Sequence, residues 1–429
     1  MRDFWRHTAK MMLALLITGC CLMSCNKDDS EYGSAKKNIF IIYSIGYNNL
    51  NIALAKDIDE AIENFRPSFP SDILMIFKHN TKIQDYTVPS APLLMQVRRN
   101  SGGNITVDTL KVYPETTISA SAETLGQVLS DIKEAHPVAN YGILFSSHST
   151  GWAPQDYCND PGAYDPEADT TPEFDWSARM ARKRPAQTWG VQMPDGSPMV
   201  KSFGSQAYKE GGETMYHEMD ITDMAAAFPM KMDYIIFDSC LMGGIEVAYE
   251  FRDVCRYMVF SQTEILAEGM DYKKLTSRVF SRNPMALTLV CKDYYNQYTN
   301  SSATISLVDC SRLEGLAGIC RRIFDSQRAE IAAMEGSTAI QKYFRYDEHK
   351  WFYDLESIIS NAGTPEDMLM TFYEELDRCM IFKADTGRFL ELKIHEHCGL
   401  SMYLPYADYD YLNAFYKTLQ WNKATGLVQ

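Results

Sequence analysis

The strongest constraint on the fold is a series of short apolar runs that lack the usual alternation of apolar and polar residues. A strand buried on both faces loses that alternation, and such strands occur in parallel sheets with helices on both sides. Between the runs, apolar residues recur at helical spacing, as in Ile52–Phe65 and Glu123–Ala135. We therefore predict an α/β fold whose predominantly parallel sheet is flanked by helices. The predicted strands are Ile39–Ile45, Ile73–Phe77, Leu93–Val97, Tyr141 to His148, Met232 to Cys240 and Tyr257–Phe260.

Two regions depart from this strand–helix rhythm. Residues 153–216 contain seven prolines together with glycines and many charges, and irregular segments of this length are usually functional or mobile. Beyond about residue 275 the pattern is helical, interrupted by two predicted strands at Ala303–Val308 and Gly399–Leu404. We predict a main domain at 39–310 that includes the irregular insert, and a mostly helical C-terminal subdomain at 311–429.

The first 38 residues have the pattern of a targeting segment. Basic residues precede an apolar stretch, Met11–Thr18, that is too short to remain as a membrane span. It leads to Leu22-Met23-Ser24-Cys25, the small-residue-then-cysteine pattern of a bacterial lipoprotein signal, although Cys20 also fits such a pattern and an ordinary secretory signal is the alternative. Polar residues directly after Cys25 favour it as the lipidation site. We expect a signal peptide at 1–24, a tether at 25–38, and a location at the outer membrane or cell surface.

Charge and cysteine usage exclude several classes of function. The formal net charge is −15, and a chain this acidic repels nucleic acid, whereas its field favours basic substrates. Eight cysteines follow the targeting segment, and none forms a Cys-x-x-Cys pair, so the sequence offers neither a zinc ribbon nor a thioredoxin-like motif. We expect most of these cysteines to be buried as small apolar residues.

Two predicted strands end in residues that carry chemistry. One apolar run stops at His148 and another stops at Cys240, and the C-terminal edge of a parallel sheet is where active sites form. An imidazole beside a thiol stabilises the thiolate and later protonates the leaving amine of a peptide. The backbone N–H groups near Gly151 and Cys240 are candidates for an oxyanion hole. Taken singly, each side chain is more often structural, as a buried cysteine or a hydrogen-bonded histidine.

The surroundings of both residues resemble the clostripain family of cysteine peptidases. His148-Ser149-Thr150-Gly151-Trp152 is similar to that family's histidine motif, and Asp238-Ser239-Cys240-Leu241-Met242 with Glu246-Val247-Ala248-Tyr249 is similar to its cysteine motif. Gly269-Met270-Asp271-Tyr272 and the two late strands extend the resemblance over most of residues 38–405. The Lys-Asp-Asp after Cys25 also resembles the export signal of surface lipoproteins in Bacteroides-like bacteria.

The resemblance implies a caspase-like fold, a His148–Cys240 dyad without an obligatory third member, and cleavage after arginine or lysine. It places Asp238 on the floor of the S1 pocket, where a carboxylate pairs with a basic P1 side chain. Outside the family, a structural aspartate at the end of a strand is the more usual explanation. A second acidic residue of the pocket would be Glu264 or Glu268. Ser149 is a departure, because the family commonly has glycine there.

The insert raises the questions of processing and of metal binding. Many family members are activated by cleavage between the histidine and cysteine segments, and either self-processing or a plain solvated loop explains the basic residues Arg179, Arg182, Lys183, Arg184, Lys201 and Lys209. Some relatives are associated with calcium, but Asp156, Asp160, Asp165 and Asp175 lack EF-hand spacing. No cofactor is required.

We expect a lipid-anchored endopeptidase acting on protein or peptide substrates. The alternatives are a catalytically silent surface binding module with a peptidase fold, and a hydrolase of non-peptide amides.

Overall fold

The computed structural model describes residues 36–81, 88–154, 206–210, 213–344, 351–407 and 409–429. Residues 37–429 form one compact unit. No helix in the described part of the chain combines the length and the apolar composition that a membrane crossing requires.

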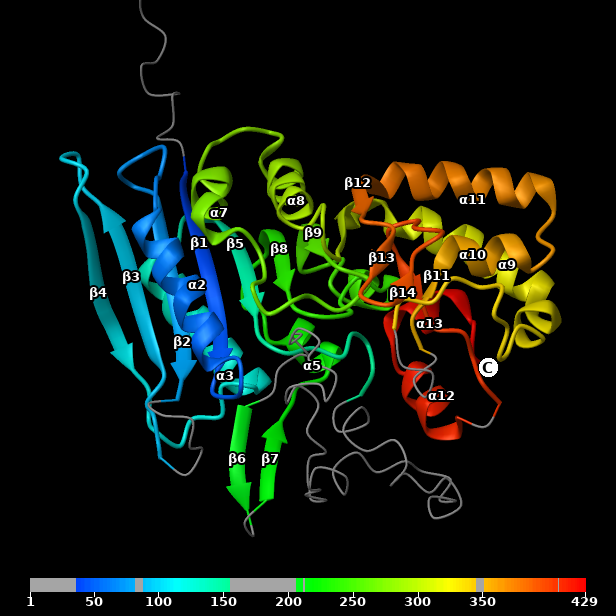
Figure 1. Ribbon diagram of the computed structural model, residues 1–429, viewed down its shortest axis with the longest axis horizontal. Coiled ribbons are helices and arrows are strands. Elements are labelled where there is room, and N and C mark those ends of the chain that lie inside the picture. The colour runs from blue at the N-terminus through cyan, green and yellow to red at the C-terminus, as the bar shows by residue number, and fades with distance from the viewer. Residues whose placement is uncertain (1–35, 82–87, 155–205, 211–212, 345–350, 408) are drawn as a thin grey trace, which may run out of the picture. The chain divides into compact units, whose positions relative to one another are not determined.

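A nine-stranded sheet runs through the unit in the order β12-β10-β9-β8-β5-β1-β2-β3-β4 (Figure 1). Its five central strands, β9, β8, β5, β1 and β2, are mutually parallel, while the two strands at each edge pair antiparallel. The strands are β1 Lys37–Gly46, β2 Ile73–Asn80, β3 Leu93–Arg99, β4 Ile105–Val112, β5 Ala139–Ser146, β8 Met232–Asp238, β9 Cys255–Phe260, β10 Thr304–Asp309 and β12 Met380–Asp385.

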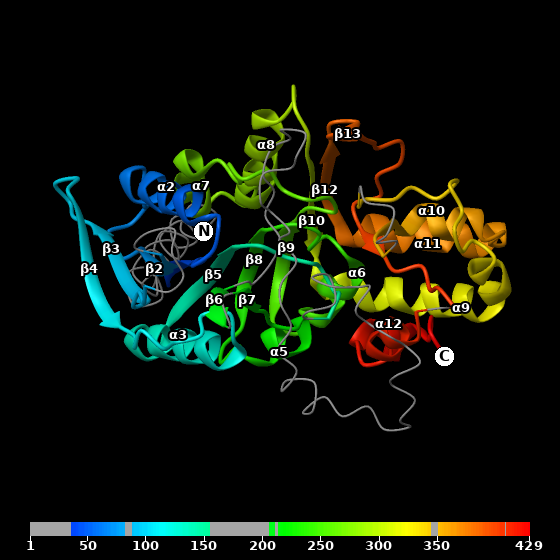
Figure 2. The same cartoon turned by 60° about the horizontal axis from the view of Figure 1, so that its bottom comes forward.

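Helices cover both faces of this sheet, as Figure 2 shows. Helices α2 (Asn51–Glu63), α7 (Tyr272–Val279) and α8 (Ala286–Gln297) lie on one face, and α3 (Ala122–Ala135), α5 (Ile221–Ala226) and α6 (Ile245–Glu250) lie on the other. The C-terminal region adds α9 (Leu313–Ala332), α10 (Leu355–Asn361), α11 (Glu366–Cys379), α12 (Asp410–Tyr416) and α13 (Gln420–Thr425). This arrangement confirms the predicted α/β fold with a predominantly parallel sheet.

Local sequence explains where the elements begin and which side they bury. Ser121 caps α3 by accepting the backbone N–H of Thr124 at 3.2 Å, and Leu125, Leu129 and Ile132 then face the sheet at helical spacing. The central strands β1 and β5 are buried along most of their length because helices cover them from both sides, as their continuous apolar runs predicted.

Several strands have no counterpart among the predicted elements. The exposed edge strand β4 alternates polar and apolar residues, and β12 supplies a strand from the C-terminal region to the main sheet. A hairpin of β6 (Gln206–Glu210) and β7 (Glu213–His217) lies inside the stretch that the sequence marks as irregular. The expected late strand Gly399–Leu404 is a two-residue strand, β15 (Ser401–Met402), paired with β11 (Tyr353–Asp354), and β13 (Arg388–Phe389) pairs with β14 (Leu392–Lys393). Such short pairings leave little periodicity to detect.

Candidate active site

The register between β5 and β8 brings the two candidate catalytic residues to one edge of the sheet. These neighbouring strands run parallel, and their last paired residues are Ser146 and Asp238. His148 and Cys240 each follow two residues later, so both leave the sheet at the same C-terminal edge. This is the edge at which open α/β sheets bind their ligands.

The chain turns sharply after Cys240, and we call residues 240–244 the nucleophile turn. Leu241 adopts a φ of 61°, which is uncommon for a residue with a side chain and persists only where the surroundings fix it. Here the Leu241 N–H donates to the Thr263 carbonyl at 3.0 Å, and the Gly243 N–H donates to the Ser261 carbonyl at 2.7 Å. These bonds occupy two N–H groups of the turn and fix it against the segment that follows β9.

Two neighbouring segments pack closely against Gly243 in the turn. A Cβ atom on Gly243 would lie 2.3 Å from the side-chain nitrogen of Gln262, so only glycine fits there. From the other side, the Ser401 N–H donates to the Gly243 carbonyl at 2.8 Å. The turn is therefore held by β9 and by β15 together.

The thiol of Cys240 lies against the segment after β9. Its residue is 1% exposed, and the Ile265 N–H points at Sγ from 3.1 Å. The other described cysteines are also buried, and burial raises the pKa of their thiols in five cases, at Cys255, Cys291, Cys320, Cys379 and Cys398. The prediction that most cysteines are buried residues is thus confirmed for the part of the chain that is described.

The loop after β5 packs directly on the nucleophile turn. His148 is buried, and its Nε2 lies 2.5 Å from Oδ1 of Asn49. The hydroxyl of Ser149 donates to the carbonyl of Cys240. Gly151 has a φ of 63°, and a Cβ there would lie 2.6 Å from the Leu241 carbonyl oxygen. The histidine loop and the turn therefore approach each other as closely as backbone allows.

Asp238 is fully buried below this edge. Its Oδ2 accepts the phenol hydroxyl of Tyr272 at 2.7 Å and the hydroxyl of Ser146 at 3.4 Å. Burial, and after it the charges of Asp238 and Asp57, raise the pKa of Tyr272, so this phenol stays protonated as a donor. Tyr272 belongs to the Gly-Met-Asp-Tyr segment that the sequence singles out, and the structure shows what its hydroxyl contacts.

The two alternatives for a second acidic residue differ in exposure. Glu264 is 4% exposed and its carbonyl accepts the Thr263 hydroxyl at 3.0 Å, whereas Glu268 is exposed to solvent. Asp57 on α2 is a further buried acid. Burial raises the pKa of Tyr298, and the charges of Asp238, Glu268 and Asp57 add to that rise. The sequence gives no reason to single out Asp57, because an aspartate on an amphipathic helix usually faces water.

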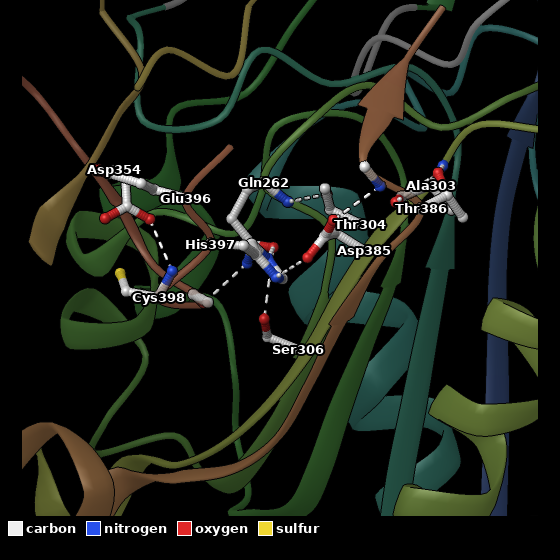
Figure 3. Close-up of polar contacts among 12 residues, drawn as sticks. Gln262, Ala303, Thr304, Ser306, Asp354, Asp385, Thr386, Glu396, His397 and Cys398 are labelled. Carbon is white, nitrogen blue, oxygen red and sulfur yellow. Dashed lines mark hydrogen bonds and ion pairs between the residues drawn. The ribbon is translucent and has the colours of Figure 1, made fainter. Parts of the chain in front are cut away.

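A second histidine, His397 from the C-terminal region, contacts the segment after β9 against which the turn packs. His397 Nε2 lies 2.7 Å from Oε1 of Gln262, and its Nδ1 lies 3.5 Å from the carboxylate of Asp385 (Figure 3). Gln262 also donates to the Gly399 carbonyl at 2.8 Å. The Thr304 hydroxyl accepts the backbone N–H groups of both Gln262 and Thr263 at 3.1 Å. These contacts fix the segment on which Cys240 rests.

A buried glutamate continues this support on α6. Oε1 of Glu246 accepts the Tyr403 N–H at 2.8 Å and the Tyr416 hydroxyl at 2.7 Å. Burial raises the pKa of Glu246 from 4.5 to about 7, and the two hydrogen bonds oppose that rise only in part. Glu246 is part of the cysteine motif, yet its contacts are structural: they join α6 to β15 and α12.

Some sequence-based expectations fall outside the described residues. These are the lipidation site Cys25, the candidate calcium ligands Asp156, Asp160, Asp165 and Asp175, and the basic residues of the insert other than Lys209, which lies in β6. Conversely, the sequence alone does not reveal Asn49, Gln262 or His397 as neighbours of the site. Each joins it through a contact between segments distant in sequence, and no local pattern marks such a contact.

Comparisons with known proteins find the same fold in several solved structures. A C11 protease from Parabacteroides distasonis, solved as an inactive zymogen, has a TM-score of 0.70 at 24% identity, covering 91% of this chain and 99% of its own. A secreted C11 cysteine protease from Bacteroides thetaiotaomicron in complex with an irreversible peptide inhibitor has a TM-score of 0.68 at 19% identity, covering 91% and 98%. A further structure of a secreted C11 cysteine protease from that organism, iotapain, scores 0.67 at 22% identity, covering 91% and 99%.

These similarities show a shared fold over nearly the whole chain. A comparison with curated proteins found no match. The model of the clostripain family matches residues 208–425, which is just over half of the sequence and includes the cysteine segment. The chain therefore belongs to the clostripain family and is a cysteine peptidase.

Proposed function

We propose that this peptidase is an endopeptidase that cleaves after arginine or lysine, with Cys240 as nucleophile and His148 as general acid and base. The observation that carries the proposal is the register of β5 and β8, which sets both residues two positions beyond the paired Ser146 and Asp238. A thiolate attacks the scissile carbonyl, and the imidazole then protonates the leaving amine.

For the oxyanion hole we propose the backbone N–H groups of Cys240 and Gly151. The N–H groups of Leu241 and Gly243 already donate to the Thr263 and Ser261 carbonyls, which supports the choice of Cys240 over its neighbours in the turn. Gly151 supports the choice in another way, since its close approach to Leu241 brings the histidine loop beside the nucleophile.

Asp238 is proposed as the recognition group for the P1 side chain. A fully buried carboxylate gains from a cationic partner, because burial removes the water that would otherwise solvate its charge. Tyr272 and Ser146 already orient Oδ2, and an arriving guanidinium or ammonium would supply the opposite charge. The net charge of −15 favours the approach of basic substrates as well. For the second acid we retain Glu264, which is buried, over the exposed Glu268.

Export and activation complete the proposal. The sequence of residues 1–38 supports a lipid anchor on Cys25 and a position at the outer membrane or cell surface, and one structural relative is described as secreted. A thiol in a residue only 1% exposed needs an opening step before a peptide reaches it, and a relative is described as an inactive zymogen. Both observations support cleavage within the 153–216 insert as the activating step.

One set of proteins tests this function in two assays. Wild type, Cys240→Ala and Asp238→Asn are compared on fluorogenic peptides with arginine, lysine, aspartate or leucine at P1. We expect wild type to cleave only after arginine and lysine, Cys240→Ala to be inactive, and Asp238→Asn to lose about 100-fold in kcat/KM on basic substrates. On a denaturing gel, wild type should show two fragments and Cys240→Ala a single chain.

The outcomes separate the parts of the proposal. Activity in Cys240→Ala would overturn the mechanism, and cleavage after aspartate would overturn the role of Asp238. Fragments from both proteins, or from neither, would exclude self-processing while leaving the peptidase assignment intact.

A further inference from the structure

Three adjacent strands deliver three polar residues to the edge of the sheet where the nucleophile lies. The parallel strands β1, β5 and β8 are neighbours in that order, and Ser44, Ser146 and Asp238 form one row across them. Beyond this row the chain continues to Asn49 after β1, to His148 after β5 and to Cys240 after β8. An amide, an imidazole and a thiol therefore follow one another along the edge.

The loop that carries Asn49 is fixed by its own hydrogen bonds. The side chain of Asn48 donates to the Ile45 carbonyl at 3.0 Å and accepts the Leu50 N–H at 2.9 Å. The Tyr47 carbonyl accepts the N–H of Ala207 on β6 at 2.8 Å, and the Ser147 hydroxyl donates to the Ile45 carbonyl at 3.1 Å. This loop is thereby tied to the residue that precedes His148, so Asn49 has a defined direction.

The contact between Asn49 and His148 has a definite polarity. Oδ1 of the amide lies 2.5 Å from Nε2 of the buried imidazole, and an amide oxygen can only accept a hydrogen bond. Nε2 must therefore carry a proton in this contact. Under the proposed function, the nitrogen left to exchange a proton with the thiol is Nδ1, because a neutral imidazole has one donor and one acceptor nitrogen.

We infer that Asn49 is a positioning residue for catalysis, which holds His148 in the Nε2–H tautomer and stabilises its imidazolium form. The inference rests on the proposed role of His148. It extends the dyad that the sequence resemblance implies by a third member, and it follows the general arrangement in which the base is oriented by another group.

The path of the protons through the reaction shows what Asn49 does at each stage. The thiol proton of Cys240 moves to Nδ1 of His148, and Sγ attacks the peptide carbonyl while the carbonyl π electrons move to oxygen. The proton on Nδ1 then passes to the leaving amine as the C–N bond breaks, which gives a thioester. Water loses a proton to Nδ1 as it attacks the thioester, and that proton returns to the sulfur as the acid departs. Nε2–H stays hydrogen-bonded to Asn49 throughout.

Asn49→Ala and Asn49→Asp test this role, with Asn51→Ala as the matched control. Asn51 is another asparagine at the start of α2, but its Oδ1 accepts the amide of Asn80 instead. Each protein is assayed for kcat and KM on a peptide with a basic P1 residue. The rate of Cys240 alkylation by iodoacetamide is measured across pH, with Cys240 identified by peptide mapping.

We expect Asn49→Ala to lose about 10- to 100-fold in kcat with KM changed by less than about threefold. The variant no longer holds His148 in the Nε2–H tautomer or stabilises its imidazolium form, whereas the contacts that bind the substrate remain. Its alkylation should slow near neutral pH, since the thiolate–imidazolium pair is weaker. Asn49→Asp keeps an acceptor and adds a negative charge beside the imidazolium. The basic limb of its pH profile, where the imidazolium loses its proton, should therefore move upward by about one pH unit. The Asn51→Ala profile should match wild type.

If Asn49 had a purely structural role, substitutions at Asn49 and at Asn51 would lower the stability of the protein and leave the pH profiles unchanged. Wild-type kcat and alkylation profiles in Asn49→Ala would overturn the inference, as would the same shift in Asn51→Ala. His148→Ala is measured beside them: if it keeps full activity, the proposed function fails, whereas an inactive His148→Ala with an unaffected Asn49→Ala overturns only the role of Asn49.

Discussion

Two buried histidines flank the nucleophile turn, and they have almost the same first contact. His148 places Nε2 2.5 Å from the amide oxygen of Asn49, and His397 places Nε2 2.7 Å from the amide oxygen of Gln262. They differ in what lies on the other side of the ring. His148 shares its edge of the sheet with Cys240, whereas Nδ1 of His397 lies 3.5 Å from the carboxylate of Asp385 (Figure 3).

Under the proposed function, two imidazoles with the same kind of amide contact have different roles, because only one of them shares its edge of the sheet with the proposed nucleophile. The 397–403 segment contacts the turn through backbone: Gly399 and Ser401 bond to Gln262 and Gly243, and Tyr403 bonds to Glu246. His397 is occupied by two side chains of the scaffold, so we interpret it as a structural residue. In the proposed function, His148 belongs instead to the catalytic side of the turn.

The largest expected effect separates the two histidines directly. His148→Ala should lower kcat about 1000-fold or more, because the general acid and base is lost. His397→Ala should keep kcat within about tenfold of wild type but lower the free energy of unfolding by about 1–3 kcal/mol, because the oxygen of Gln262 then keeps only the longer bond from the Ser306 hydroxyl, at 3.4 Å. Steady-state kinetics and urea unfolding on the same preparations measure both quantities.

Equal losses of kcat in two folded variants would break the comparison. In that case His397 would belong to the catalytic machinery, and the 397–403 segment would no longer count as scaffold.

A smaller effect is expected at Glu246, on the scaffold side. Because the folded-state pKa is raised from 4.5 to about 7, the ionised carboxylate destabilises the fold, and this cost is absent below about pH 4.5, grows between pH 4.5 and 7 and is constant above. Glu246→Gln keeps an acceptor for Tyr403 and Tyr416. It should therefore stabilise the protein by about 3 kcal/mol at pH 8 and by nearly nothing at pH 4.

Urea unfolding at these two pH values measures the difference, and Glu330→Gln on the exposed side of α9 serves as the control with no pH dependence expected. A stabilisation of Glu246→Gln that is the same at both pH values would contradict the assigned cause. A loss of kcat without a change in stability would move Glu246 to the catalytic side.

The central part of the fold was predictable from sequence for a physical reason. Strands buried on both faces have continuous apolar runs, and all five parallel strands at the centre of the sheet were expected. The exposed edge strand β4 was not, because it alternates polar and apolar residues and lacks the continuous apolar run of the central strands, and the two-residue strands are too short to show any pattern. β12 was missed because it joins the sheet from a region whose pattern is helical.

The residues of the candidate site also fall into those that the sequence predicts and those that it does not. His148, Asp238 and Cys240 lie at the ends of apolar strands, where the sequence marks both the strand and its final polar residue. Asn49 and Gln262 also follow strands, yet an amide in a loop resembles any turn residue. His397 precedes no regular strand at all, and its contact with Gln262 spans 135 positions. Long-range contacts of this kind depend on the completed fold.

The smallest expected effect tests whether the catalytic side also contributes structure. The hydroxyl of Ser149 donates to the carbonyl of Cys240, which ties the histidine loop to the nucleophile turn. Removing one buried donor in Ser149→Ala should cost about 1 kcal/mol of unfolding free energy and leave kcat within about threefold, because neither the thiol nor the imidazole is touched. Ser149→Gly should cost slightly more, since glycine also makes the unfolded chain more flexible. If instead both variants lost 100-fold in kcat at unchanged stability, Ser149 would act in the reaction itself. It would then belong to the catalytic side of the turn and not to its structural support.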